Sequence, residues 1–171
     1  MKKQTKKREL LTIVLGLYQI IGGLIGLILA LIVILNIKSL QYLLLPVVIL
    51  AILFYCFSIF AGISLFKKRK YALRISLINQ CIQLVNFSFL GYAFEYVAGI
   101  YVFLGFDLTN SFQLDLNYGL SSWILNINNQ SSTIFLHFNV IAFLIILFIL
   151  KLIENQKNEE SLRDVEAIGS T

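Results

Sequence analysis

The sequence predicts an all-α membrane protein, namely a bundle of four transmembrane helices with a small extracytoplasmic β-hairpin between the third and the fourth helix. The composition is 58% hydrophobic and only 13% charged, with a mean hydropathy of +0.84, unlike that of a soluble domain. The apolar residues fall into runs of about 20 or more, the length that crosses about 30 Å of hydrocarbon. Lysines and arginines gather beside these runs, as they do next to membrane spans.

The first span is predicted for residues 10–37, directly after a basic segment, residues 1–9, that holds five of the fourteen lysines and arginines. The apolar run is longer than that of a cleavable signal peptide and no cleavage site follows it, so we expect an uncleaved helix. Small residues form a ridge on this helix, which allows another helix to approach closely. The ridge predicts packing within the chain, with homodimerisation as the alternative; its residues are Gly16, Gly22, Gly23, Gly26 and Ala30.

The second span is predicted for residues 42–66 and ends at the basic turn Lys67–Lys70. The third span is predicted for residues 71–90, and its apolar pattern continues to residue 106. One helix over residues 71–106 would measure about 54 Å, which is more than the hydrocarbon needs. We therefore expect the second part either to project from the membrane or to lie in its outer interface.

Polar side chains recur along the predicted third span at steps of three, four and three residues. This spacing places them on one face of a helix. Because an unpaired amide in hydrocarbon is costly, this polar stripe should face protein or water. Two roles stay open for it, the packing of the bundle and the lining of a pore. The stripe consists of Ser76, Asn79, Gln83 and Asn86.

Residues 107–132 form the main segment that we expect outside the membrane. Apolar and polar residues alternate on both sides of a turn-like stretch, residues 119–121, which predicts a β-hairpin. The fourth span is predicted for residues 134–153, followed by a cytoplasmic tail, residues 154–171. Glu95 and His137 fall near the outer boundary of the third and fourth spans, where they would form an ionisable pair if these helices are neighbours.

Thirteen of the fourteen lysines and arginines fall on one side of this arrangement, with Lys38 as the exception. This distribution predicts a multi-pass protein of the cell membrane with both termini in the cytoplasm. The expected partner of the basic residues is the lipid bilayer, and they do not indicate nucleic-acid binding. Because no catalytic motif, metal-ligand spacing or cofactor-binding loop is visible, we expect no enzyme activity, no cofactor and no metal.

Three segments of the sequence resemble a known group of proteins: LYQIIGGLIGL at 17–27, LFYCFSIFAGISLFKKRK at 53–70 and LRISLINQCIQLVNFSFLGYAFEYVAGIY at 73–101. They resemble uncharacterised small four-helix membrane proteins of bacteria. The resemblance implies the four-helix fold but no activity and no functional residue. We expect a non-catalytic protein that acts through interaction, as a subunit of a membrane assembly or as a homo-oligomer. The alternative is a small channel or carrier that uses the polar stripe.

Overall fold

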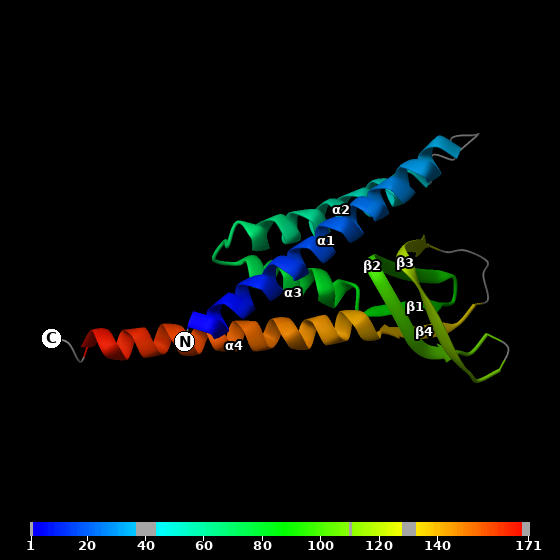
Figure 1. Ribbon diagram of the computed structural model, residues 1–171. Helices are drawn as coiled ribbons and strands as arrows, with labels where there is room; N and C mark the ends of the chain where they lie inside the picture. Colours follow the sequence, from blue (N-terminus) through cyan, green and yellow to red (C-terminus); the bar gives the residue numbers. More distant parts are fainter. Residues whose placement is uncertain (1, 37–43, 110, 128–132, 169–171) are drawn as a thin grey trace.

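The computed structural model describes residues 2–36, 44–109, 111–127 and 133–168 (Figure 1). In these residues the chain forms four helices and one antiparallel sheet of four strands. In chain order the elements are α1 (Lys2–Asn36), α2 (Leu44–Phe66), α3 (Ala72–Ile82), β1 (Val85–Phe89), β2 (Tyr92–Asp107), β3 (Gln113–Asn126), β4 (Phe135–Asn139) and α4 (Val140–Ile168).

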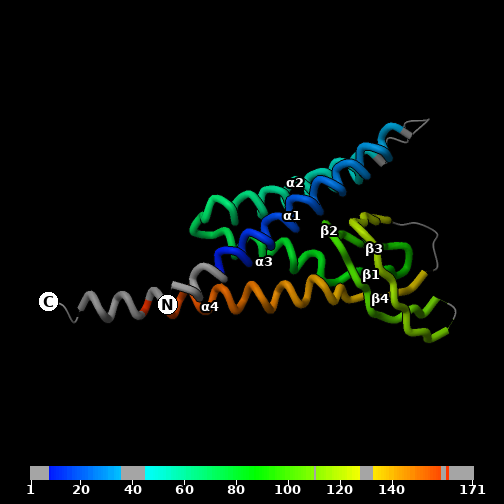
Figure 2. The backbone as a smooth tube through the Cα atoms, viewed as in Figure 1, coloured from blue at the N-terminus to red at the C-terminus, as the bar shows by residue number. Residues whose placement is uncertain are grey.

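Helices α1 and α2 form a long antiparallel hairpin that leans away from α4, while α3 lies between α2 and α4 (Figures 1 and 2). The segments Arg8–Leu35 and Leu45–Phe66 are long and apolar enough to cross a membrane, by length and composition. The single proline, Pro46, lies in the first turn of α2, where a missing backbone donor does not interrupt the helix. Two of the helices therefore match the first two predicted spans.

The predicted bundle of four transmembrane helices is wrong, because the chain after Ile82 turns into strands. Helix α3 has only 11 residues, about 16 Å, which is too short to cross the hydrocarbon. Leu90 and Gly91 both adopt positive φ, +48° and +83°, and form a two-residue turn between β1 and β2. The aromatic and β-branched residues that follow suit a strand, and an apolar run without polar breaks does not distinguish strand from helix.

The predicted fourth span, residues 134–153, is also divided. Residues Phe135–Asn139 form β4, and α4 begins only at Val140. Asn139 caps this helix, since its side-chain oxygen accepts the backbone N–H groups of Ile141 and Ala142 at 3.1 and 3.3 Å. The apolar part of α4 is therefore shorter than a membrane span.

The strand order of the sheet is β1-β4-β2-β3, and β1 also pairs with the start of β2. The long strand β2 pairs with β1 in its first half, with β4 in its second half and with β3 along nearly its whole length. The sheet therefore curls until β1, β4 and β2 enclose an inner face. Among the described residues, β3 is the only strand with a single neighbour.

The predicted β-hairpin in residues 107–132 is replaced by one continuous strand, β3. The partner of β3 is β2, and the register between them shifts at Val97 and Ile100. Residues 119–121, which we expected to form a turn, lie beside this irregularity, and Ser121 has a positive φ of +47°. A long partner strand satisfies more backbone groups than an isolated hairpin, which is marginal in water.

The two faces of the sheet differ in chemistry. Its inner face is buried and carries polar residues next to apolar ones: Asn86, Ser88, Ala93, Glu95, Val97, Phe103, His137 and Asn139. Its outer face packs on α2 at one end, where Tyr96 and Ala98 join Ala51 and Tyr55. The rest of the outer face is apolar and exposed: Phe87, Phe89, Tyr92, Ile100, Leu104, Phe106, Leu114, Leu116, Tyr118, Leu120, Leu136 and Phe138.

Candidate functional site: a buried polar junction

A network of polar side chains joins three helices at the centre of the molecule. Gln19 of α1, Ser58 of α2 and Ser76 and Asn79 of α3 are all completely buried. The Gln19 side-chain amide donates to the Ser76 hydroxyl, and the Ser58 hydroxyl donates to the Gln19 carbonyl oxygen at 3.0 Å. Asn79 Nδ2 then donates to Ser58 Oγ at 3.2 Å. The network therefore ties α1, α2 and α3 together.

The same network continues from α3 into the sheet. The Tyr96 hydroxyl of β2 donates toward the Phe54 carbonyl oxygen at 2.8 Å and Asn79 Oδ1 at 3.1 Å. Gln83 directly follows α3, and its Oε1 accepts the backbone N–H of Ala98 at 2.9 Å while its Nε2 donates to the Asn79 carbonyl oxygen at 3.2 Å. These bonds satisfy polar groups that have no access to water.

The structure thus brings Ser76, Asn79 and Gln83 of the predicted stripe into one network, and it places the fourth residue elsewhere. Asn86 lies on β1 rather than on the helix, and its Oδ1 accepts the backbone N–H of Tyr96 at 3.2 Å. All four side chains are fully buried, and each forms at least one hydrogen bond with protein, whereas Asn86 Nδ2 has no partner among the described residues. Such an arrangement holds elements together, and it leaves no stripe surface exposed to a solute.

The glycine ridge of α1 faces two other elements of the same chain. Gly16, Gly23 and Gly26 lie against α2, where a Cβ atom would meet Gly62, Ile59 or Tyr55. A Cβ atom at Gly22 would instead lie 2.5 Å from the backbone of Ala98 and Gly99 in β2. Ala30, at the end of the ridge, is 8% exposed. The small residues therefore allow close approach within one chain, and α2 and β2 occupy this side of α1.

Ser121 connects the ridge to the irregular part of the sheet. Its hydroxyl accepts the backbone N–H of Gly99 at 3.0 Å and donates to the Gly22 carbonyl oxygen at 3.1 Å. Gly99 has a φ of +119°, a conformation that side chains rarely adopt. Side chains of Gln83 and Ser121 thus replace the strand-to-strand hydrogen bonds that the register shift removes from Ala98 and Gly99.

Glu95 and His137 both lie on the inner face of the sheet and interact electrostatically, while the carboxylate in direct contact with His137 belongs to a third residue. His137 Nε2 lies 3.1 Å from Asp115 Oδ2 of β3, although the alignment is not that of a hydrogen bond. The imidazole ring stacks on the rings of Phe103 and Phe135 and passes over Gly105, where a Cβ atom would collide with it. The His137 side chain of β4 thus reaches Asp115 of β3 across the backbone of β2.

Burial raises the pKa of Glu95 above its ordinary value, while a hydrogen bond with Ser122 and the charge of His137 partly oppose this shift. The carboxyl group therefore favours its neutral form more than an exposed glutamate does. In the described part of the chain, no three histidine, cysteine or acidic side chains lie close enough to hold a metal ion.

The sequence analysis predicted no place in a polar network for several members of the junction, among them Gln19, Ser58, Tyr96 and Ser121. Gln19 is the only amide in the apolar run of residues 10–35, and this isolated polar residue could have indicated a buried hydrogen bond. The pairing of Asp115 with His137 required knowledge of the strand order, since β4 and β3 meet only across β2.

Together these features define a helical hairpin joined to a curled antiparallel sheet through a buried polar network. No family model, curated protein or solved structure matches the chain. The resemblance to four-helix bacterial membrane proteins therefore stays a prediction, and the fold it implied is replaced by the one described above.

Proposed function

We propose that this chain is a non-catalytic membrane protein that acts by assembly, and that it associates with a second copy of itself through β3. Helices α1 and α2 would cross the bilayer, with the basic N-terminal segment and residues 67–70 on the cytoplasmic side. The observation that carries the proposal is the edge of β3 that pairs with no other strand of the described residues, together with the exposed apolar side chains of β3.

The depth of the sheet supports this proposal. Gly22, which touches β2, lies 14 residues after Arg8, or about 21 Å along α1. This is the middle of the apolar segment Arg8–Leu35. If α1 crosses the bilayer, the sheet would thus lie beside the half of the hairpin that is far from the basic turn, and its apolar outer face would meet lipid.

The edge of β3 then needs a partner for a physical reason. An open strand edge leaves backbone N–H and C=O groups unpaired, and each such group costs several kcal/mol in hydrocarbon. Sheet edges in water are commonly protected by lysine or proline, yet β3 contains neither. Four large apolar residues alternate along it and are 50–75% exposed: Leu114, Leu116, Tyr118 and Leu120.

A second copy is the partner that we propose because an antiparallel strand edge is complementary to itself about a two-fold axis. The glycine ridge and the polar stripe are not proposed as the contact surface, since both already pack within the chain. A pore along the stripe is not proposed either, because its four side chains are fully buried.

The experiment is a mass measurement of the protein after gentle extraction from its own membrane. We expect a homodimer, and we expect Leu116→Lys to convert it to a monomer by placing a charge on the free edge. Leu104→Lys is the matched control, since Leu104 lies directly opposite Leu116 on the same face but on a strand that is paired on both sides. A monomeric wild type, a different protein held in fixed ratio, or equal loss of dimer in both variants would refute self-association through β3.

A further inference from the structure

A cavity of about 300 Å³ lies at the end of the helical hairpin that is remote from the sheet. The start of α1, the turn between α2 and α3 and the middle of α4 form its walls. Its size is that of the smaller ligand sites in proteins. The polar junction described above contributes no residue to it.

The walls of the cavity combine two kinds of chemistry. Its floor is apolar and includes Leu65, Leu73 and Leu152. Its rim carries four basic side chains and one carboxylate: Arg8, Lys68, Arg69, Lys70 and Glu9. A site with a hydrocarbon floor and a cationic rim fits a ligand that is itself apolar at one end and anionic at the other.

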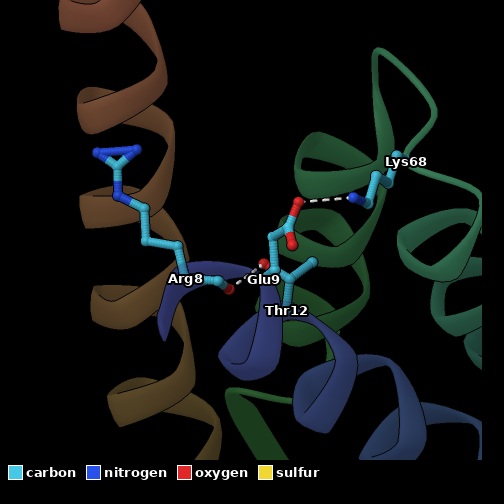
Figure 3. A network of polar contacts seen from close by, with 4 residues as sticks. All are labelled: Arg8, Glu9, Thr12 and Lys68. Carbon is cyan, nitrogen blue, oxygen red and sulfur yellow. Dashed lines mark hydrogen bonds and ion pairs between the residues drawn. The ribbon is translucent and has the colours of Figure 1, made fainter. Parts of the chain in front are cut away.

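Glu9 is the carboxylate of this rim, and it forms an ion pair with Lys68. The Glu9 Oε1 atom lies 2.7 Å from Lys68 Nζ, and the two side chains point toward one another (Figure 3). Arg8 extends from the same turn of α1 toward α4 (Figure 3). Arg69 and Lys70 contact the aromatic rings of Phe60 and Tyr71, and neither forms an ion pair with a carboxylate of the described residues. The described lining thus holds four basic side chains and one carboxylate.

The cavity lies where a lipid headgroup would be found. Arg8 begins the first apolar segment and Phe66 ends the second, and both residues line the cavity. It is thus at one boundary of the two segments that are long enough to cross a membrane. Basic pockets at this level bind the headgroups of anionic lipids.

We propose that this cavity binds one anionic phospholipid, with the phosphate on the Arg69 and Lys70 side and an acyl chain along the leucine floor. The inference rests on the proposed crossing of the bilayer by α1 and α2. The inference does not depend on β3. A monomer in the mass measurement above would therefore not overturn lipid binding, and an absence of bound lipid would not overturn the dimer.

The test counts the phospholipid molecules that stay bound to detergent-purified protein, by native mass spectrometry, after addition of phosphatidylglycerol or phosphatidylcholine. We expect one tightly bound phosphatidylglycerol and no comparable phosphatidylcholine. The double variant Arg69→Gln and Lys70→Gln should weaken this binding roughly 30-fold, from about a five- to sixfold loss for each basic residue.

The matched control is the double variant Lys67→Gln and Arg74→Gln, which removes the same charge from the turn and from the start of α3, at two residues outside the cavity lining. This control variant should change the affinity for phosphatidylglycerol by less than about threefold. Equal weakening by both double variants would mean general surface attraction and would overturn the site. Retention of phosphatidylcholine at the same affinity, or displacement of phosphatidylglycerol by millimolar inorganic phosphate, would overturn the choice of an anionic lipid.

Discussion

Two glutamines that are close in sequence allow a test of the polar junction, because only one of them forms side-chain hydrogen bonds with the described residues. Gln80 and Gln83 are both completely buried and lie three residues apart. Gln83 accepts the backbone N–H of Ala98 at 2.9 Å, whereas neither polar atom of the Gln80 amide has a hydrogen-bond partner among the described residues. The two positions therefore share residue type and burial but differ in hydrogen bonding.

Gln83→Leu should destabilise the protein, since it leaves the Ala98 N–H group buried and unpaired at the register shift of β2. A buried donor without a partner costs about 1–3 kcal/mol. With a shift of about 2–4 °C per kcal/mol for a chain of this size, a loss near 2 kcal/mol lowers the Tm by about 4–8 °C. Gln80→Leu should leave the Tm unchanged or raise it, because it removes a buried amide that forms no bond.

The assay is thermal unfolding of the two variants and the wild type in one detergent, followed by circular dichroism. The conclusion rests on the difference in Tm between the two variants, since the detergent affects both alike. Equal Tm values for Gln83→Leu and Gln80→Leu would refute the assignment of Gln83 as the residue that satisfies the irregular part of the sheet.

Two further predictions concern close packing and burial of charge. Gly22→Ala should destabilise the protein by about 1–3 kcal/mol or prevent folding, because its Cβ atom would lie 2.5 Å from the backbone of β2, which has little freedom to move. Gly16→Ala is the milder control, with Cβ contacts of 3.1–3.3 Å, and similar Tm values for the two variants would contradict the close contact between α1 and β2. For Glu95, whose pKa is raised by burial, the folded state binds more protons than the unfolded state above pH 4.5, so stability should fall as the pH rises from there toward the raised pKa. Glu95→Gln should remove this slope in unfolding curves measured across that range, and a wild type without the slope would contradict the buried carboxyl group.

The sequence was sufficient to predict the helical hairpin and the burial of part of the polar stripe. Residues 10–37 and 42–66 carry long apolar runs with basic ends, and such runs are typical of helices that cross a membrane. Ser76, Asn79 and Gln83 follow the period of a helix, and that period continues until α3 ends at Ile82. These features depend on local chemistry alone.

The sheet was not predicted because its signals conflict with a helical pattern. In residues 85–107 the outer face is apolar and the inner face is also partly apolar, so the alternation expected of a strand is weak. The turn at Leu90 and Gly91 places a leucine at positive φ, and leucine is not a typical turn residue. The pairing of β2 with three different strands depends on contacts between distant parts of the chain, which no local pattern contains.

A cysteine scan in intact membranes tests whether β3 is a self-association edge. Cys56 and Cys81 are both exposed and would first be replaced by alanine. Single cysteines would then be placed at each position from Gln113 to Leu120 and at the control position Leu104, and oxidised. A residue on a two-fold axis faces its own copy at a Cα distance of about 4.5–5.5 Å, which suits a disulfide bond.

We predict that the yield of covalent dimer peaks at one position of β3 and falls on both sides of it, with little dimer at Leu104. Cross-linking that is absent from β3, uniform along it, or equally strong at Leu104 would contradict a dimer formed by pairing of this edge.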